Sequence, residues 1–206
     1  MPDPAFLAIA LLLAVTPGPG LFYVAARALA GGRAEGVASS FGTGLGGLAH
    51  VLAGSLGVSA LVLASAELFA LLKLAGAGYL VWLGVRAVLE ARRDAVPGAV
   101  PSPMGTRRAF REGVVVEALN PKTAAFFLAF LPQFVDPAAG SVALQFVILG
   151  VVSVALNTLA DLVVAFAAGR VRAGVARPGL VRRLREAAGA AMVALGVGLL
   201  LARRPA

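Results

Sequence analysis

Long apolar runs, separated by short polar and charged stretches, dominate the pattern of this 206-residue chain. A helix needs about 20 mostly apolar residues to cross the hydrocarbon core of a bilayer. Six stretches approach or exceed that length, and we expect spans near 5–29, 37–65, 68–89, 113–135, 142–168 and 187–202. The last is short, and polar residues interrupt the fourth. The pattern predicts an all-α integral membrane protein with six transmembrane helices.

The composition agrees with a bilayer environment. Hydrophobic residues make up 60% of the chain and charged residues 14%, with a mean hydropathy of +0.92. Soluble domains are about 45–50% apolar and about 25% charged, so this chain has too few polar residues to cover a water-facing surface. The start, Met1 to Pro4, lacks the basic region of a cleaved signal peptide, and the first stretch is interpreted as a retained span.

The net charge of +8 places limits on partners. In membrane proteins, excess Lys and Arg gather in cytoplasmic loops, and no soluble domain offers a basic face, so no nucleic-acid partner is expected. The absence of cysteine excludes thiolate metal sites and dithiol redox chemistry. We expect no metal and no cofactor. Membrane lipids surround the spans, and the sequence leaves open whether two copies form a homodimer.

Basic residues also predict an orientation. Fourteen of the 18 Lys and Arg residues flank the first, third and fifth connections. The positive-inside rule places these connections in the cytoplasm and both termini outside. Arg203 and Arg204 disagree with that placement of the C-terminus.

A basic linker rich in Pro and Gly, residues 94–112, divides the chain into halves 1–93 and 113–206. Each half holds three predicted spans. An odd number gives related halves opposite topologies, so the spans are expected to form two inverted three-helix repeats. Inverted repeats of this kind are common in secondary transporters.

Two of the predicted spans are interrupted by matched motifs: Thr16-Pro17-Gly18-Pro19 in the first, and Asn120-Pro121-Lys122 in the fourth. Prolines stop a regular helix, whereas a capping residue followed by proline starts one. We therefore expect half-helices that end near Val15 and begin at Pro17 and Pro121. In inverted halves these N-termini converge, and their N–H groups could hold a carboxylate. The alternative is that the prolines only kink the two helices.

The fifth span contains a carboxylate, Asp161, with Asn157 one turn before it on the same face. Charges within spans are costly and often functional. Asp161 could exchange a proton, bind a substrate ammonium, or form a structural ion pair with Lys122. Lys122 in turn could face the anion or extend to the cytoplasmic interface. Glu117 is interpreted as a solvated residue at a helix end.

Other polar and small residues favour packing roles. His50, the only histidine, is expected to hydrogen-bond a neighbouring helix, with a proton relay as the alternative. The run Gly42–Gly47 matches GxGxxG, but it lies inside an apolar helix and indicates close helix contact. Four phenylalanines at helical spacing are expected to contact the core or lipid: Phe126, Phe127, Phe130 and Phe134.

Thr16-Pro17-Gly18-Pro19, and Asn120-Pro121-Lys122 followed by Phe126-Phe127 and Leu131-Pro132-Gln133-Phe134, resemble the LysE/RhtB family of amino-acid exporters. The resemblance covers nearly the whole chain. It implies a multi-pass protein of the bacterial inner membrane, not an enzyme, that exports amino acids or close derivatives using a proton or ion gradient. It does not identify the amino acid.

The resulting hypothesis is a proton-coupled secondary exporter, an antiporter, of a zwitterionic amino acid. Backbone N–H groups after Thr16-Pro17 and Asn120-Pro121 would hold the carboxylate. Asp161, together with Asn157, would hold the ammonium or carry the coupling proton. Lys122 would tune the charge of the site. The alternative, a divalent metal transporter, needs clustered carboxylates, histidines or thiolates, which the spans offer sparsely. An intramembrane enzyme lacks a paired carboxylate, HExxH or GxSxG motif.

Overall fold

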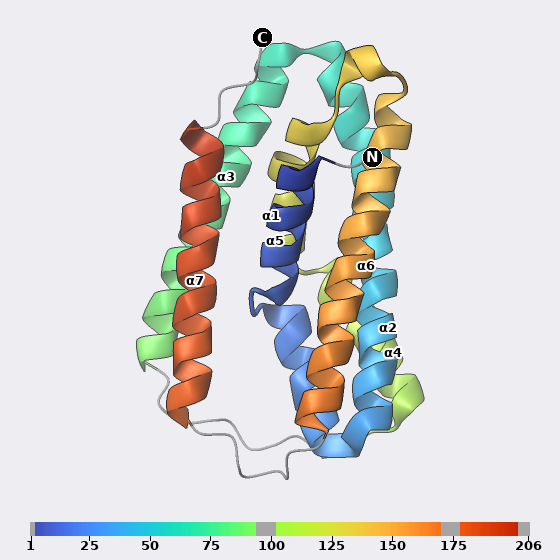
Figure 1. Ribbon diagram of the computed structural model, residues 1–206, viewed down its shortest axis with the longest axis vertical. Helices are drawn as coiled ribbons and strands as arrows, with labels where there is room; N and C mark the ends of the chain where they lie inside the picture. Colours follow the sequence, from blue (N-terminus) through green and yellow to red (C-terminus); the bar gives the residue numbers. More distant parts are fainter. Residues whose placement is uncertain (1–2, 94–101, 170–177, 202–206) are drawn as a thin grey trace.

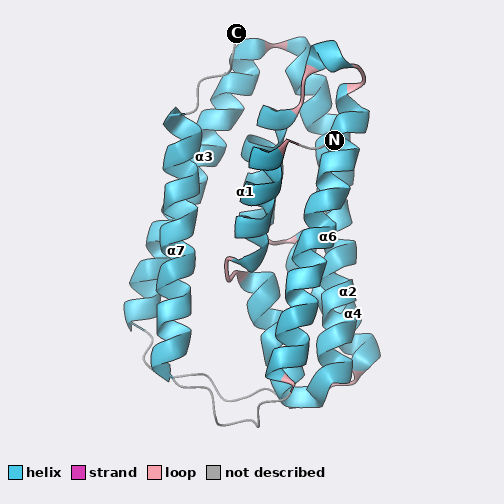
Figure 2. Cartoon of the chain, viewed as in Figure 1, coloured by secondary structure: helices cyan, strands magenta, loops and turns pink. Residues whose placement is uncertain are grey.

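The computed structural model describes residues 3–93, 102–169 and 178–201, and these residues form helices and no strand (Figures 1 and 2). Seven α-helices are present in the described part: α1 (Pro4–Val15), α2 (Pro19–Ala64), α3 (Ala66–Arg93), α4 (Thr106–Ala118), α5 (Pro121–Ala125), α6 (Val142–Ala168) and α7 (Pro178–Leu201). A π-helix (Phe126–Phe130) and two 3₁₀ segments (Leu131–Phe134 and Pro137–Ala139) follow α5. The predicted all-α architecture is confirmed.

The helices form two groups. α2 packs against α4 and α6, and α3 packs against α7. In Figure 1, α3 and α7 stand together on one side, while α1 and α5 lie in the middle between that pair and α6. The chain directions alternate, so that α3 runs opposite to α7, and the later part of α2 runs opposite to α6. α1 and α5 are therefore held between two antiparallel helix pairs.

Membrane-spanning character is clearest for two helices. Glu67–Arg92 and Val142–Ala168 are each long and apolar enough to cross a bilayer. Two further spans result if each broken helix counts as one, namely Pro4–Val15 with Pro19–Gly57, and Thr106–Ala118 with Pro121–Phe134. Large apolar side chains also face outward, such as Leu56 and Leu119, each 76% exposed. Such a surface suits lipid and not water.

The first predicted connection, between 29 and 37, is a single residue. α2 is helical from Pro19 to Ala64 except at Gly32, whose φ of 73° and ψ of −170° reverse the chain. Residues other than glycine rarely adopt such a backbone conformation. The two helical parts of α2 therefore form a tight hairpin (Figure 1), which the sequence pattern showed as a longer gap.

At two basic segments a helix begins before the predicted apolar span. α4 begins at Thr106, inside the stretch interpreted as linker, because 106–112 continues the same helix although three arginines make it polar. α7 begins at Pro178, nine residues before the predicted span. In both cases a helix extends past the apolar region, and hydropathy alone reports only the apolar part. The linker residues 94–101 lie outside the described part.

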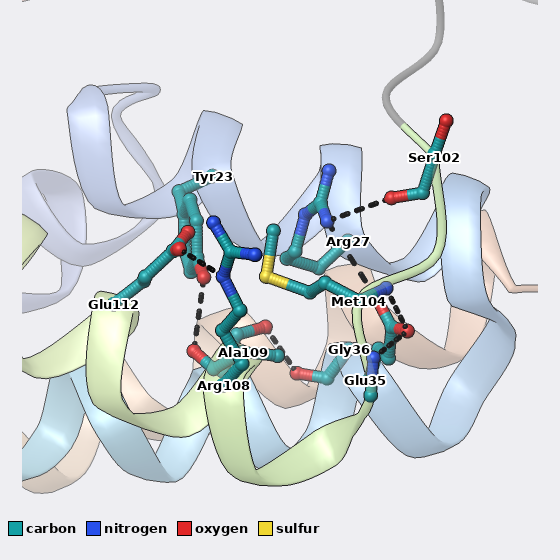
Figure 3. Close-up of polar contacts among 11 residues, drawn as sticks. Tyr23, Arg27, Glu35, Gly36, Ser102, Met104, Arg108, Ala109 and Glu112 are labelled. Carbon is teal, nitrogen blue, oxygen red and sulfur yellow. Dashed lines mark hydrogen bonds and ion pairs between the residues drawn. The ribbon is translucent and has the colours of Figure 1, made fainter.

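A buried ion pair fixes the start of α4 against the α2 hairpin (Figure 3). Arg27 and Glu35, 2% and 4% exposed, stand 3.7 Å apart across the hairpin. Glu35 Oε1 accepts the N–H groups of Met104 and Gly105 at 2.8 and 2.7 Å, and Arg27 donates to Ser102 O at 3.2 Å. Tyr23 adds a bond to Ala109 O. Arg27, one of the basic residues beside the first connection, is thus a buried structural residue.

Small residues allow the helices to approach closely. The prediction that Gly42–Gly47 packs against a helix is confirmed, since a Cβ at Gly42 or Gly46 would meet the backbone oxygens of Phe110 and Val114 on α4. The predicted phenylalanine cluster also lies in the core, where the Phe126 and Phe130 rings stack at 5.7 Å. On the other side of the molecule, a Cβ at Gly84 of α3 would stand 2.5 Å from Gly189 O of α7.

The contact between Gly84 and Gly189 yields a stability prediction. Gly84→Ala forces α3 and α7 apart, and overpacking of this kind costs about 1–3 kcal/mol. We expect a lower melting temperature in detergent, measured by size-exclusion chromatography after heating. Gly78→Ala is the matched control. Gly78 lies on the same helix as Gly84, and a Cβ there would have no neighbouring atom within 4 Å. Equal melting temperatures for the two variants would show that the helix contact is not close.

Candidate functional site

The first break separates α1 from α2 and bends the pair by 46°. α1 ends at Val15, as predicted, and Thr16 is extended with ψ of 114°. A residue before proline disfavours the helical region, and both Thr16 and Gly18 precede a proline. The second half-helix consequently begins at Pro19, where Phe22 N–H first bonds to Gly18 O at 2.9 Å. The predicted start at Pro17 is wrong by two residues.

Thr16 does not cap the second half-helix. Its hydroxyl donates to Leu12 O at 2.6 Å, and its N–H bonds to Leu12 O and Leu13 O. Thr16 therefore completes the C-terminal end of α1. The prediction of an N-terminal cap is wrong, because the extra proline at position 19 moves the helix start away from the threonine.

The second break follows the predicted pattern. Asn120 lies between α4 and α5, is 2% exposed, and its Oδ1 accepts Lys122 N–H at 3.0 Å. Pro121 is the first residue of α5. The pair of helices is bent by 41°. Asn120 caps the half-helix as the sequence predicted, because a single proline leaves the asparagine directly beside the helix start.

Lys122 connects the two breaks. Its side chain is 4% exposed, and its ammonium donates to Leu13 O at 3.2 Å and Thr16 O at 2.9 Å. These carbonyls belong to the C-terminal end of α1, where the helix dipole favours a cation. Lys122 neither extends to the membrane interface nor forms an ion pair with Asp161. Gly18 makes room for it, since a Cβ there would lie 3.0 Å from Lys122 Cε.

Glu117, on the last turn of α4, contacts the other side of the first break. Its carboxylate accepts Asn120 Nδ2 at 2.9 Å and Thr123 Oγ1 at 2.6 Å, and the side chain is 3% exposed. Its Oε2 also lies against Gly20, in the first turn of α2. A carboxylate is favourable at that positive helix end. The interpretation of Glu117 as a solvated end residue is wrong.

Asp161 is fully buried on α6. Its Oδ2 is 2.7 Å from Thr43 Oγ1 and 3.4 Å from Asn157 Nδ2. Its Oδ1 has no hydrogen-bond partner among the described residues. Thr43 Oγ1 also stands 2.8 Å from Ser40 O. A hydroxyl carries one proton, so Thr43 cannot donate to both oxygens at once.

A small cavity lies beside Thr43 and Asn157, the two hydrogen-bond partners of Asp161. It measures about 20 Å³, and its mostly apolar lining includes the polar residues Thr43, Glu117, Thr123, Ser153 and Asn157. That space accommodates about one water molecule. His50 lies nearby, where its Nε2 is 2.9 Å from Glu117 O. The expected hydrogen bond from His50 to a neighbouring helix is confirmed.

A larger pocket of about 400 Å³ lies on the other side of the breaks, toward α3 and α7. Its wall combines both proline motifs with α3 and α7: Pro17, Gly18, Pro19, Phe22, Leu83, Arg86, Ala87, Glu90, Pro121, Lys122, Arg185, Ala188 and Met192. We call it the break pocket. Its size falls within the range of small-molecule sites, about 300–1,000 Å³.

The structure thus divides the predicted site residues into two sets. Pro17, Gly18, Pro19, Pro121 and Lys122 line the break pocket, whereas Asp161 and Asn157 lie behind the breaks with Thr43. Thr16 and Asn120 hold the helix ends between them.

The buried role of Glu117 and the charged side chains of α3 and α7 in the break pocket were not predicted from the sequence. The sequence contains an indication of the contact between Glu117 and Asn120. A residue three positions before the capping asparagine lies one turn away on the same helix face. For Arg86, Glu90 and Arg185 we find no signal, since each resembles an interfacial charge.

The metal alternative finds no support. Among the described residues, no group of three or more His, Cys, Asp or Glu side chains is placed to hold a metal ion.

Comparison with known proteins bears on the whole chain. The family model described as LysE type translocator matches residues 11–203. The homoserine/homoserine lactone efflux protein of Salmonella typhimurium (strain LT2) is 31% identical over 97% of this chain and 96% of its own length. The leucine efflux protein of Enterobacter sp. (strain 638) is 29% identical over 68% of this chain and 66% of its own. An uncharacterised membrane protein of Vibrio cholerae is 28% identical over 96% of this chain and 95% of its own.

No solved structure matches the chain. The family match nevertheless covers most of its length, including both proline motifs, and the outward-facing apolar surface agrees with a multi-pass membrane protein. Because the family is one of translocators, the expectation that the chain is not an enzyme is confirmed. The chain belongs to the LysE type translocator family, within which its relatives include efflux proteins of the RhtB group.

Proposed function

We propose that this protein is a proton-coupled exporter of a zwitterionic amino acid, and that the break pocket binds the substrate. The observation that carries the proposal is the convergence of both proline motifs on one 400 Å³ pocket. Non-helical backbone at membrane depth is tolerated where it lines a cavity or is buried in protein. The names of two relatives, efflux proteins for homoserine and for leucine, indicate the chemical class.

An inverted repeat accounts for how the two motifs meet. Corresponding helices of the two halves lie side by side and antiparallel, α3 with α7 and the later part of α2 with α6 (Figure 1). The first part of α2 descends from its break, whereas α5 ascends from its own. Half-helix N-termini that approach from opposite directions are typical of inverted-repeat transporters. We therefore propose six spans in two inverted halves.

The orientation proposal follows from the same arrangement. The hairpin at Gly32, the end of α3, the start of α4, the end of α6 and the start of α7 all lie at one end of the molecule (Figure 1). These are the arginine-rich connections, so the positive-inside rule places this end in the cytoplasm. Arg86, Glu90 and Arg185 lie in the parts of α3 and α7 nearest to that end, and the break pocket accordingly extends from mid-membrane toward the cytoplasm.

Asp161 is the proposed proton carrier. An ionised carboxylate without an ion-pair partner is expensive to bury, and among the described residues Asp161 has no cation within ion-pair distance. A proton on Oδ2 satisfies the network, because Asp161 then donates to Thr43 and Thr43 donates to Ser40 O. In this conformation the group is closed off from the break pocket. This role suits a proton better than a substrate ammonium.

The direct test of the function is transport into inverted membrane vesicles, whose cytoplasmic face is outward. We expect accumulation of radiolabelled leucine, homoserine or a related neutral amino acid that increases when the vesicle interior is acidified. Vesicles from cells lacking the protein are the control. Uptake of no amino acid, together with uptake of a divalent metal ion, would replace this proposal by the metal alternative.

Asp161→Asn tests the proton carrier. The amide cannot exchange a proton, so we expect stimulation by the pH gradient to fall to the level of control vesicles while membrane insertion is unchanged. Asp136→Asn is the control, because Asp136 is exposed in the loop before α6. Initial uptake rates with and without the gradient are measured. Normal stimulation in Asp161→Asn would contradict the assignment.

Lys122→Met tests the connection between the breaks. It leaves the carbonyls of Leu13 and Thr16 without their charged donor, and an unsatisfied buried group costs about 1–3 kcal/mol. We expect a lower melting temperature in detergent and loss of transport. Gly18→Ala displaces the ammonium but keeps its charge, and should have a smaller effect in the same direction. Gly198→Ala, with no atom within 4 Å of its Cβ, should have none.

A further inference from the structure

The groups expected to bind substrate are already engaged with one another. The Lys122 ammonium is bonded to two carbonyls, and the Glu117 carboxylate lies against the first turn of α2. Asp161 does not line the break pocket. The charges in that pocket that remain for a substrate come from its opposite wall, on α3 and α7. They are Arg86, Glu90 and Arg185.

Arg185 is half-buried and has no carboxylate within ion-pair distance among the described residues. Its guanidinium lies over the Phe22 ring, with Cζ 5.3 Å from the centroid. Stacking on an aromatic face leaves the edge of a guanidinium, with its N–H donors, available for a bidentate acceptor. A carboxylate is the acceptor that matches this fork.

Glu90 offers the opposite charge in the same pocket. It pairs with Arg86 one turn earlier on α3, with Arg86 Nε 2.5 Å from Glu90 Oε1. Both side chains are more than half exposed, and an exposed pair of this spacing contributes little. Arg86 also lies over the Trp82 ring at 5.5 Å, which holds it when Glu90 binds another cation. Glu90 can therefore exchange this partner for an ammonium.

The space between these charges is apolar. It is lined by apolar residues of three helices: Leu83 and Ala87 of α3, Ala188 and Met192 of α7, and Phe22 of α2. A charged substrate side chain that packed against these apolar residues would lose its hydration. An uncharged side chain fits this surface.

We propose that the wall formed by α3 and α7 recognises the two charged groups of the substrate, with Arg185 binding the α-carboxylate and Glu90 the α-ammonium. The inference rests on the proposed function and assigns its recognition residues. The breaks then form the mid-membrane floor of the site.

The experiment compares three ligands in inverted vesicles carrying the full chain. For a protein that transports leucine, they are leucine, 3-methylbutylamine, which lacks the carboxylate, and 4-methylpentanoate, which lacks the ammonium. For homoserine, the analogues are 3-aminopropan-1-ol and 4-hydroxybutanoate. Each unlabelled analogue competes with the labelled amino acid, and the half-inhibiting concentrations are measured.

Arg185→Gln should raise the half-saturating amino-acid concentration roughly 10- to 100-fold, the value of a charged hydrogen bond. It should also remove the discrimination against the amine analogue while keeping that against the acid analogue. Glu90→Gln should do the reverse. These opposite losses distinguish recognition from a general structural effect, which would weaken all three ligands together.

Two control substitutions lie on α7. Arg183→Gln changes an exposed arginine of α7, and Glu186→Gln changes a carboxylate that pairs with Arg92 and Arg182 outside the pocket. Both should behave as wild type. If Arg185→Gln matches Arg183→Gln while Asp161→Asn still abolishes stimulation, the recognition assignment is wrong and the exporter proposal stands. If the unmodified protein transports no amino acid, the exporter proposal itself fails.

Discussion

At the centre of this protein, the two broken helices pair each other's free backbone groups with charged side chains. The rest of the fold is arranged around that contact. The ammonium of Lys122, from the second break, lies on the C-terminal carbonyls of α1. The carboxylate of Glu117, from the same break, lies against the first turn of α2. Each charge faces the helix end of opposite polarity. In a bilayer, unpaired backbone groups cost several kcal/mol each, so these contacts between the two breaks stabilise both of them.

This contact also separates two environments. Behind the breaks, Thr43 and Asn157, which both contact Asp161, line a small cavity of about 20 Å³. In front of them, α3 and α7 complete a pocket of about 400 Å³. In the proposed mechanism a proton occupies the first region and an amino acid the second. The residues between them, Lys122 and Glu117, are then the physical connection through which one can affect the other.

Close contacts between helices, made possible by small residues, stabilise this arrangement. Gly42 and Gly46 bring α2 against the backbone of α4, and Gly84 does the same for α3 and α7. At the end of the molecule that we place in the cytoplasm, the Arg27–Glu35 pair fixes residues 102–105 to the α2 hairpin. In the absence of a hydrophobic driving force between helices in lipid, small residues and hydrogen bonds are what determine association.

The sequence by itself determined the membrane class, the helical fold, both proline interruptions and the capping role of Asn120. These depend on hydropathy and on local backbone chemistry, which short stretches of sequence carry. Tertiary structure decided the rest. The ammonium of Lys122 bonds to residues more than 100 positions away in the sequence. The Thr16 hydroxyl bonds to α1 and not to the helix that follows it, and Glu117 is buried. The charged wall of Arg86, Glu90 and Arg185 exists only where α3 meets α7. No local pattern encodes such long-range contacts, because each depends on which helix the fold places opposite.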